Sequence, residues 1–215
     1  MCATSRMTAS QSTQPRSERK RRAILEAATE TFLRKGYLGT TMDEIAASAA
    51  VSKQTVYKHF ADKESLFTEI VTGAVDAVSD PHHEDVLGLG DSADVEADLR
   101  ALAERQLERV MQPRLLALRR LVIGEAGRFP ELGRAYYERG AGRTIEALAS
   151  AFEQLAARGM LRLDDPQLAA AHFNWLVMSI PLNRAMLCGD DEPPGPADLE
   201  RYAEAGVRVF LAAYT

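Results

Sequence analysis

The sequence contains little that would cross-link a protein or anchor it in a membrane. Cys2 and Cys188 are its two cysteines in 215 residues, which is too few for a disulfide framework and fits a reducing compartment. No apolar run approaches the roughly 18 residues that cross a bilayer. Residues 1–18 are polar and lack the apolar stretch of a secretory signal. We therefore expect a cytoplasmic protein without membrane contact.

The chain also lacks long stretches of alternating polar and apolar residues, the pattern typical of strands. Residues 1–15 are rich in serine and threonine, which predicts a disordered arm that starts at Met1 or Met7. Behind this arm, apolar spacing and capping signals predict an all-α fold, with a loop at 79–94 where glycine, proline and acids cluster. The expected helices are 16–35, 42–49, 53–60, 63–78, 94–111, 113–127, 131–158, 166–188 and 197–213.

A net positive charge is found only in the N-terminal part of this acidic chain. The net charge is −5, yet residues 1–60 hold ten basic and five acidic side chains, and residues 61–215 hold sixteen and twenty-six. A basic head on an acidic body indicates that only the head meets phosphate groups.

Within this head, the sequence predicts two short helices joined by a tight turn, the arrangement that lets one helix enter a DNA major groove. Thr41 and Glu44 have the spacing of a capping box, and Ser52 suits the N-cap of the second helix. Val56 and Phe60 would anchor that helix. The residues between 53 and 59 would then point mostly outward, with hydroxyl, amide, ammonium and imidazole groups and no carboxylate, as base edges and phosphates require.

These residues resemble those of a known family. Residues 19–66 are similar to the DNA-binding domain of the TetR family of bacterial regulators. Ala50 stands where the family usually has glycine at the turn. Because a non-glycine residue with positive φ carries a modest strain, we expect this turn to be shaped slightly differently. Gln54 replaces a frequent small residue and can pair with adenine. The matching features are Ile24–Ala28, Phe32, Gly36–Tyr37, Thr40–Thr41, Ile45–Ala46, Val51–Lys53, Val56–Phe60 and Lys63–Leu66.

The resemblance implies a homodimeric repressor that binds near-palindromic, double-stranded operator DNA. It implies that Thr41, Tyr57, His59 and Lys63 contact the phosphate backbone and that residues 53–55 face the groove, although Tyr57 could equally be packing and His59 could be a plain surface histidine. The expected DNA-binding residues are Arg19, Arg22, Thr40, Thr41, Ser52, Lys53, Gln54, Thr55, Tyr57, Lys58, His59 and Lys63.

A second similarity, over residues 121–140, is to the C-terminal regulatory domain of the AefR-like branch of this family. It implies a large helical domain that binds a ligand and dimerises through the last two helices. The segments 166–188 and 197–213 are apolar on more than one face, so a partner copy would supply their second burial surface. The expected parts are an arm at 1–15, a three-helix helix-turn-helix domain at 16–61, and a ligand-binding and dimerisation domain at 62–215.

An apolar cavity in the second domain would suit a small hydrophobic or aromatic effector that releases the operator. For any single residue, ordinary core packing is the stronger interpretation. Arg119, His172 and Asn174 are candidates for the cavity's polar groups. The expected ligand-binding residues are Phe67, Met111, Leu118, Val122, Tyr136, Phe173, Trp175 and Met178.

Two other classes of protein remain open. An enzyme is disfavoured, because Glu125, Glu131, Asp164 and Asp165 form no spaced pair with histidine or cysteine, and no phosphate loop or hydrolase motif is present. We expect no cofactor and no metal, although residues 82–85, His-His-Glu-Asp, could bind a metal if they were not simply solvated. A purely structural DNA-binding protein would hardly need so large an acidic body.

Overall fold

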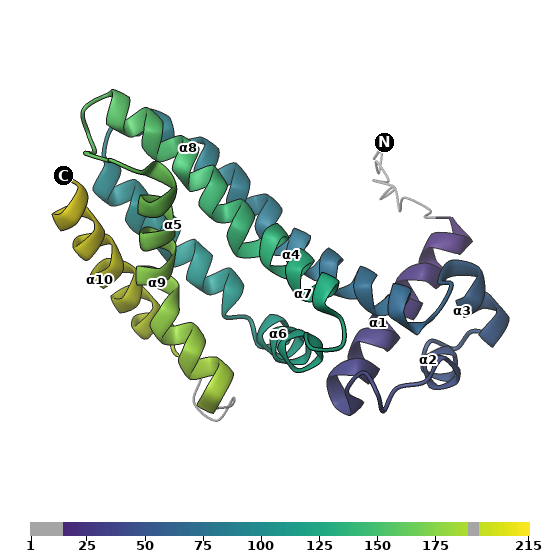
Figure 1. The fold of residues 1–215 in the computed structure, drawn as a ribbon. Helices are drawn as coiled ribbons and strands as arrows, with labels where there is room; N and C mark the ends of the chain where they lie inside the picture. Colours follow the sequence, from purple (N-terminus) through teal and green to yellow (C-terminus); the bar gives the residue numbers. More distant parts are fainter. Residues whose placement is uncertain (1–14, 189–193) are drawn as a thin grey trace, which may run out of the picture. The chain divides into compact units, whose positions relative to one another are not determined.

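The structure, a computed structural model, describes residues 15–188 and 194–215 (Figure 1). Throughout these residues it contains helices and no strand, which confirms the all-α prediction. The chain divides into two units, with the boundary between Phe67 and Thr68, slightly beyond the boundary that the sequence predicts at 61. Apart from Pro15, the expected arm lies outside the described residues.

Unit 1 consists of α1 (Arg16–Lys35), α2 (Met42–Ser48), α3 (Lys53–His59) and the first residues of α4 (Lys63–Leu87). Helix α1 has the bounds that the sequence predicts, and Gly36 ends it with a φ of 72°. Glycine adopts this left-handed conformation without the steric cost that a side chain brings. The buried core of unit 1 includes Ile24, Ala28, Phe32, Ile45, Val56, Phe60, Leu66 and Phe67.

The helix-turn-helix forms through the capping groups that the sequence predicts. The Thr41 hydroxyl accepts a bond from the Glu44 N–H, and the Glu44 carboxylate accepts one from the Thr41 N–H. Ser52 caps α3 in a similar way through the N–H of Thr55. Ala50, in the turn, has a φ of 52°. A residue with a Cβ therefore occupies the left-handed region here, at the cost of local strain.

The main departure from the sequence prediction is α4, which continues through Pro81 to Leu87. The predicted loop at 79–94 is therefore wrong over its first half. Buried side chains recur along the helix at intervals of three and four residues, as on an amphipathic helix. From residue 75 onward, the buried positions of this helix are Val75, Ser79, His82 and Val86. Burial of Val75 and Val86 contributes about 3–6 kcal/mol to stability, which offsets the roughly 3 kcal/mol that an interior proline costs.

Two of the acidic residues that suggested a loop, Asp80 and Asp85, are ion-paired within unit 2, as is Asp76 just before them. Three aspartates of α4 meet arginines that lie between 20 and 63 residues further along the chain. Pairing across such distances cannot be recognised from local sequence, which explains why the helix was missed. The pairs are Asp76–Arg139, Asp80–Arg143, Asp85–Arg105 and Asp85–Arg109.

The rest of unit 2 is formed by six further α-helices in the described residues. Helix α9 packs against both α8 and α10, and α10 also packs against α5 (Figure 1). At the centre of this packing, the rings of Phe152 and Phe173 lie 5.0 and 5.3 Å from that of Phe210. The bounds are α5 (Val95–Val110), α6 (Pro113–Glu125), α7 (Pro130–Tyr137), α8 (Arg143–Ala157), α9 (Pro166–Cys188) and α10 (Pro196–Tyr214).

A π-helical segment, Glu138–Gly142, divides the single helix that the sequence predicts at 131–158. It contains Gly140 and Gly142, and glycine inside a helix costs about 1 kcal/mol relative to alanine. A Cβ at Gly140 would lie 3.6 Å from a methyl group of Val75 on α4. Segments of this kind often occur at functional sites, and this one lies against the cavity described below.

Helices α9 and α10 also expose large apolar side chains. On the buried side Gly206 is in close contact with α9, where a Cβ would lie 2.9 Å from Val177 Cγ2. The apolar residues left exposed on these two helices are Leu168, Trp175, Leu176, Ile180, Leu187 and Val209.

Over the same ranges, 15–188 and 194–215, no helix is long and apolar enough to cross a membrane.

Candidate DNA-binding face and effector cavity

Helix α3 carries six of the twelve residues that the sequence assigns to DNA. Val56 and Phe60 are buried and hold the helix against the core of unit 1. Tyr57 is 45% exposed, so it is not a core residue in unit 1. Gln54, Thr55, Tyr57 and Lys58 line one shallow depression in the surface. Packing thus turns amide, hydroxyl and ammonium groups outward, as a groove-reading helix requires.

One acidic side chain adjoins this face. Asp43 of α2 lies 2.7 Å from Lys53 Nζ at the start of α3. Its hydrogen bond and negative charge raise the pKa of the exposed Lys53 ammonium. Lys53 therefore stays positively charged, while Asp43 fixes where the ammonium group lies. Phosphate groups of DNA would compete with Asp43 for this cation.

Residues at the start of α2 and α4 serve the protein's own structure. The Thr40 hydroxyl is buried and donates to the carbonyl oxygen of Gly36 at 2.8 Å. Lys63 Nζ donates to the carbonyl oxygens of Tyr37 and Thr40 at 2.9 and 2.8 Å, and lies 4.3 Å from the centre of the Tyr37 ring. Their polar groups are thus engaged within unit 1, whereas Thr41 is exposed and caps α2. Thr40 and Lys63 are therefore better placed to position α2 than to bind phosphate.

Two of the predicted contacts lie on α1. Arg19 and Arg22 are exposed there, and between them Arg21 lies over the ring of Phe60, 5.3 Å from its centre. His59, at the end of α3, is partly exposed. The structure thus places the predicted DNA-binding residues within unit 1, mostly at its surface.

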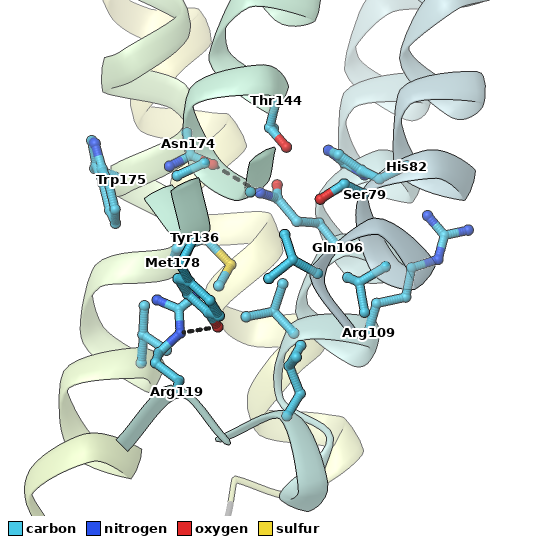
Figure 2. Close-up of a pocket in the computed structure, with 17 residues that line it drawn as sticks. Ser79, His82, Gln106, Arg109, Arg119, Tyr136, Thr144, Asn174, Trp175 and Met178 are labelled. Carbon is cyan, nitrogen blue, oxygen red and sulfur yellow. Dashed lines mark hydrogen bonds between the residues drawn. The ribbon is translucent and has the colours of Figure 1, made fainter. Parts of the chain in front are cut away.

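Unit 2 contains a partly open cavity with a volume of about 60 Å³. Figure 2 shows its lining side chains, which come from α4, α5, α6, α7, α8, α9 and the π-helical segment. Apolar groups form most of its wall, as is usual for ligand sites. The apolar lining includes Val75, Val78, Val110, Leu115, Trp175, Met178 and Leu182.

Polar groups gather in one part of the cavity, where Ser79, His82, Gln106, Thr144 and Asn174 point toward one another (Figure 2). Gln106 Nε2 donates to Asn174 Oδ1 at 2.8 Å. The Gln106 Oε1 atom and both ring nitrogens of His82 are buried and have no hydrogen-bond partner within the described residues. Burial, followed by the positive charge of Arg109, lowers the pKa of His82 to about 4. His82 is therefore a neutral imidazole at physiological pH.

Two arginines also line the cavity, and they differ in their partners. Arg109 is neutralised by Asp85, whose carboxylate accepts its hydrogen bond at 2.6 Å. Arg119 of α6 donates to the hydroxyl of Tyr136 on α7 at 3.2 Å. It forms no ion pair with any residue that the structure describes. The cavity thus carries net positive charge, because its described lining contains no carboxylate.

The structure brings together three of the eight residues predicted to bind ligand. Tyr136, Trp175 and Met178 line the cavity. Phe67 is buried in unit 1. The remaining four, Met111, Leu118, Val122 and Phe173, are buried in unit 2 outside the cavity lining.

Sequence reasoning missed several polar residues of the cavity. His82 is the clearest case, since the sequence places it in a solvated loop while the structure buries it on α4. Its spacing from Val75 and Ser79 was the available signal. Of the polar candidates, Arg119 and Asn174 line the cavity, whereas His172 lies outside it and pairs with the hydroxyl of Tyr214.

The described residues contain no group of three metal-binding side chains that could hold an ion. Cys188 is a free, exposed thiol, and Cys2 lies outside the described residues.

An exposed polar helix of a helix-turn-helix in an N-terminal unit, followed by a larger helical unit, is the arrangement of a DNA-binding transcriptional regulator. The family models agree. The bacterial regulatory proteins of the tetR family match residues 24–70, and the C-terminal domain of AefR-like transcriptional repressors matches residues 97–215. The chain belongs to the TetR family, with an AefR-like C-terminal domain, and is a DNA-binding transcriptional regulator rather than an enzyme.

Solved structures extend the similarity over nearly the whole chain. A TetR-family transcriptional regulator from Mesorhizobium loti is 46% identical, with a TM-score of 0.85, over 94% of this chain and 99% of its own. The flavonoid-responsive regulator FrrA is 34% identical, with a TM-score of 0.75, over 92% of this chain and 98% of its own.

Similarity to curated relatives covers about a quarter of the chain. The transcriptional activator FasR of Mycolicibacterium smegmatis is 45% identical over 62 residues, which are 29% of this chain and 28% of FasR. The chain thus matches little more than a quarter of the length of such relatives.

Proposed function

We propose that the protein is a homodimeric repressor that leaves its operator when a small aromatic effector enters the cavity of unit 2. The observation that carries this proposal is the presence, in one chain, of an outward-facing α3 and a separate, partly polar cavity. Members of the family bind operator DNA and act as dimers with small-molecule effectors. The match to AefR-like repressors favours repression over activation, although FasR shows that a similar head can belong to an activator.

In this proposal, α3 reads the major groove. Gln54 and Thr55 are placed to meet base edges, and glutamine can bind adenine through two hydrogen bonds. Lys53, Lys58 and the α1 arginines would bind phosphate groups, which supply affinity for any DNA sequence. Tyr57 and His59 fit backbone contacts at the same face.

The exposed apolar side chains of α9 and α10 support dimerisation. Several large apolar side chains exposed on two helices that pack together are typical of an interaction site. A twofold dimer would bury the same patch on both copies and present two α3 helices to successive major grooves, about 34–36 Å apart. We expect Ile180→Arg, which places a charge on this patch, to give monomers in light scattering.

The effector would act through α4. This helix contains Lys63, which supports the 37–40 turn of unit 1, and also Val75, Ser79 and His82, which line the cavity of unit 2. A ligand that favours one position of α4 would favour one spacing of the two α3 helices. It can shift that equilibrium only by its difference in affinity for the two states. The similarity to FrrA, a flavonoid-responsive regulator, supports an aromatic effector.

DNA binding can be tested by band shift with the upstream region of the protein's own gene. Lys58→Ala should weaken binding to specific and nonspecific DNA alike, and reduce the slope of log K against log salt by about one. Gln54→Ala should weaken operator binding by about 1–3 kcal/mol and leave nonspecific binding unchanged.

Arg134→Ala is the matched control, since it removes one exposed cation from unit 2. Equal loss from Lys58→Ala and Arg134→Ala would contradict the assignment of α3. A promoter–reporter strain then separates the two outcomes for transcription, because deletion of a repressor raises reporter output and deletion of an activator lowers it.

A further inference from the structure

Two side chains in the cavity of unit 2 carry hydrogen-bonding atoms that the protein does not use. His82 is 3% exposed and Gln106 is 5% exposed. The three atoms concerned are Gln106 Oε1, His82 Nδ1 and His82 Nε2, none of which has a partner in the described residues. Buried polar atoms are nearly always hydrogen-bonded. Such a cluster at a cavity wall therefore indicates the place where a ligand supplies the missing partner.

The chemistry of these atoms restricts what that partner can be. Gln106 Nε2 is engaged with Asn174, which leaves Oε1 as an acceptor. His82 is neutral, because burial and the charge of Arg109 lower its pKa to about 4, so its ring offers one donor and one acceptor. A hydroxyl group can donate to one of these acceptors and accept from the imidazole N–H. A purely apolar ligand would leave all three atoms unpaired.

The remainder of the cavity restricts the ligand's charge and shape. Arg119 lines it without an ion pair among the described residues, and the described lining contains no carboxylate, so a cation would be repelled. Tyr136 and Trp175 provide aromatic surface, which favours stacking or edge contact with another ring.

We propose that the effector is a phenol, an aromatic compound whose ring hydroxyl is held by His82 and Gln106. This inference rests on the proposed function, which requires only that some aromatic molecule enters the cavity, and it adds the group that is recognised. The weak acidity of a phenol suits a site whose charged groups are arginines.

Trp175 provides a direct assay. It is the chain's single tryptophan and it lines the cavity, so its fluorescence reports on occupancy. The full-length protein is titrated with two matched pairs of probes, naphthol against naphthalene and chrysin against flavone. The members of each pair share a ring skeleton and differ only in their hydroxyl groups. We expect the hydroxylated member to bind at least about tenfold more tightly. The member without a hydroxyl group leaves buried polar atoms unpaired, and this weakens its binding.

Variants locate the preference. His82→Leu and Gln106→Leu should each reduce the hydroxyl preference toward one while naphthalene and flavone still bind. A variant that merely disturbed the cavity would weaken both members of a pair equally. His172→Gln is the matched control, because this histidine lies on α9 outside the cavity lining, where it pairs with the hydroxyl of Tyr214. It should keep the preference of the unmodified protein. Melting temperatures of all variants verify that they fold.

Three results would overturn the proposal. They are equal binding within both pairs, a preference that survives in both leucine variants, and no binding of either hydroxylated probe at millimolar concentration. The same preparations are tested for operator binding and for operator release by each probe. Release by flavone and chrysin alike would refute the phenol assignment and leave the proposed function intact. If the unmodified protein does not bind its operator when no probe is added, the proposed function itself is refuted.

Discussion

The buried histidine of the cavity should make the protein sensitive to mild acid. His82 titrates near 6.5 when exposed, and its pKa in the folded protein is about 4. The folded state therefore binds fewer protons than the unfolded state between these two values, and stability falls as pH decreases through this window. Between about pH 7.5 and pH 5 the loss from His82 alone amounts to about 2 kcal/mol.

The charges around His82 act in opposite directions. Burial lowers its pKa most, the positive charges of Arg109 and Arg105 and of the adjacent His83 lower it further, and Asp85 raises it. Asp85 keeps its negative charge through this range. Although burial acts to raise the pKa of Asp85, its hydrogen bond from Arg109 and the charge of Arg105 hold that pKa below its usual value. The change between pH 7.5 and pH 5 thus belongs to the imidazole.

Thermal unfolding at a series of pH values measures the effect. One kcal/mol shifts the melting temperature of a protein of this size by about 2–4 °C, so His82 should account for a fall of about 4–8 °C. In His82→Leu, the melting temperature should fall by about 4–8 °C less over this pH range. Near neutral pH the variant should melt no lower than the unmodified protein, since leucine leaves no nitrogen unpaired. His59→Gln, which removes a partly exposed imidazole from α3, is the control. If both variants kept the full acid sensitivity, the assignment to a buried neutral His82 would be refuted.

Other changes test the packing and the turns. Gly206→Ala should cost about 1–3 kcal/mol in stability, because its Cβ would lie 2.9 Å from Val177 Cγ2. Gly124→Ala should instead stabilise α6 by about 1 kcal/mol, because its Cβ would meet nothing within 4 Å. Thermal unfolding of the two variants measures both effects. Ala50→Gly should stabilise unit 1 by up to about 1 kcal/mol in denaturant titration, since glycine accepts a positive φ without strain, and a loss of stability would show that the turn is not strained. Thr41→Ala should cost about 1 kcal/mol in the same titration through loss of the N-cap of α2, and an unchanged midpoint would show that the capping box contributes nothing.

Local signals in the sequence were sufficient for unit 1. The helix at 16–35, the capping box at Thr41 and the N-cap at Ser52 all depend on residues within four positions of one another, and the structure has each of them. The resemblance to a family then added the function.

Non-local interactions explain what the sequence did not reveal in unit 2. Helix α4 continues past Pro81 because its aspartates meet arginines from α5 and from residues 139 and 143. The cavity was predicted only in part because an apolar residue has the same sequence pattern whether it faces a cavity or another side chain. Phe173 and Met178 lie on the same helix, and only Met178 reaches the cavity.

The extension of α4 changes how an effector signal can be understood. If the helix ended near residue 78, as the sequence predicts, His82 would belong to a loop and a ligand at that residue could order only the loop. In the structure His82 lies on the same helix as Lys63, and the ammonium group of Lys63 holds two carbonyl oxygens just before α2. A ligand that binds His82 therefore acts on a residue that shares a continuous helix with a support of the DNA-binding unit. The ion pairs at Asp76, Asp80 and Asp85 fasten this helix within unit 2, so any effector that moves it must bind strongly enough to rearrange them.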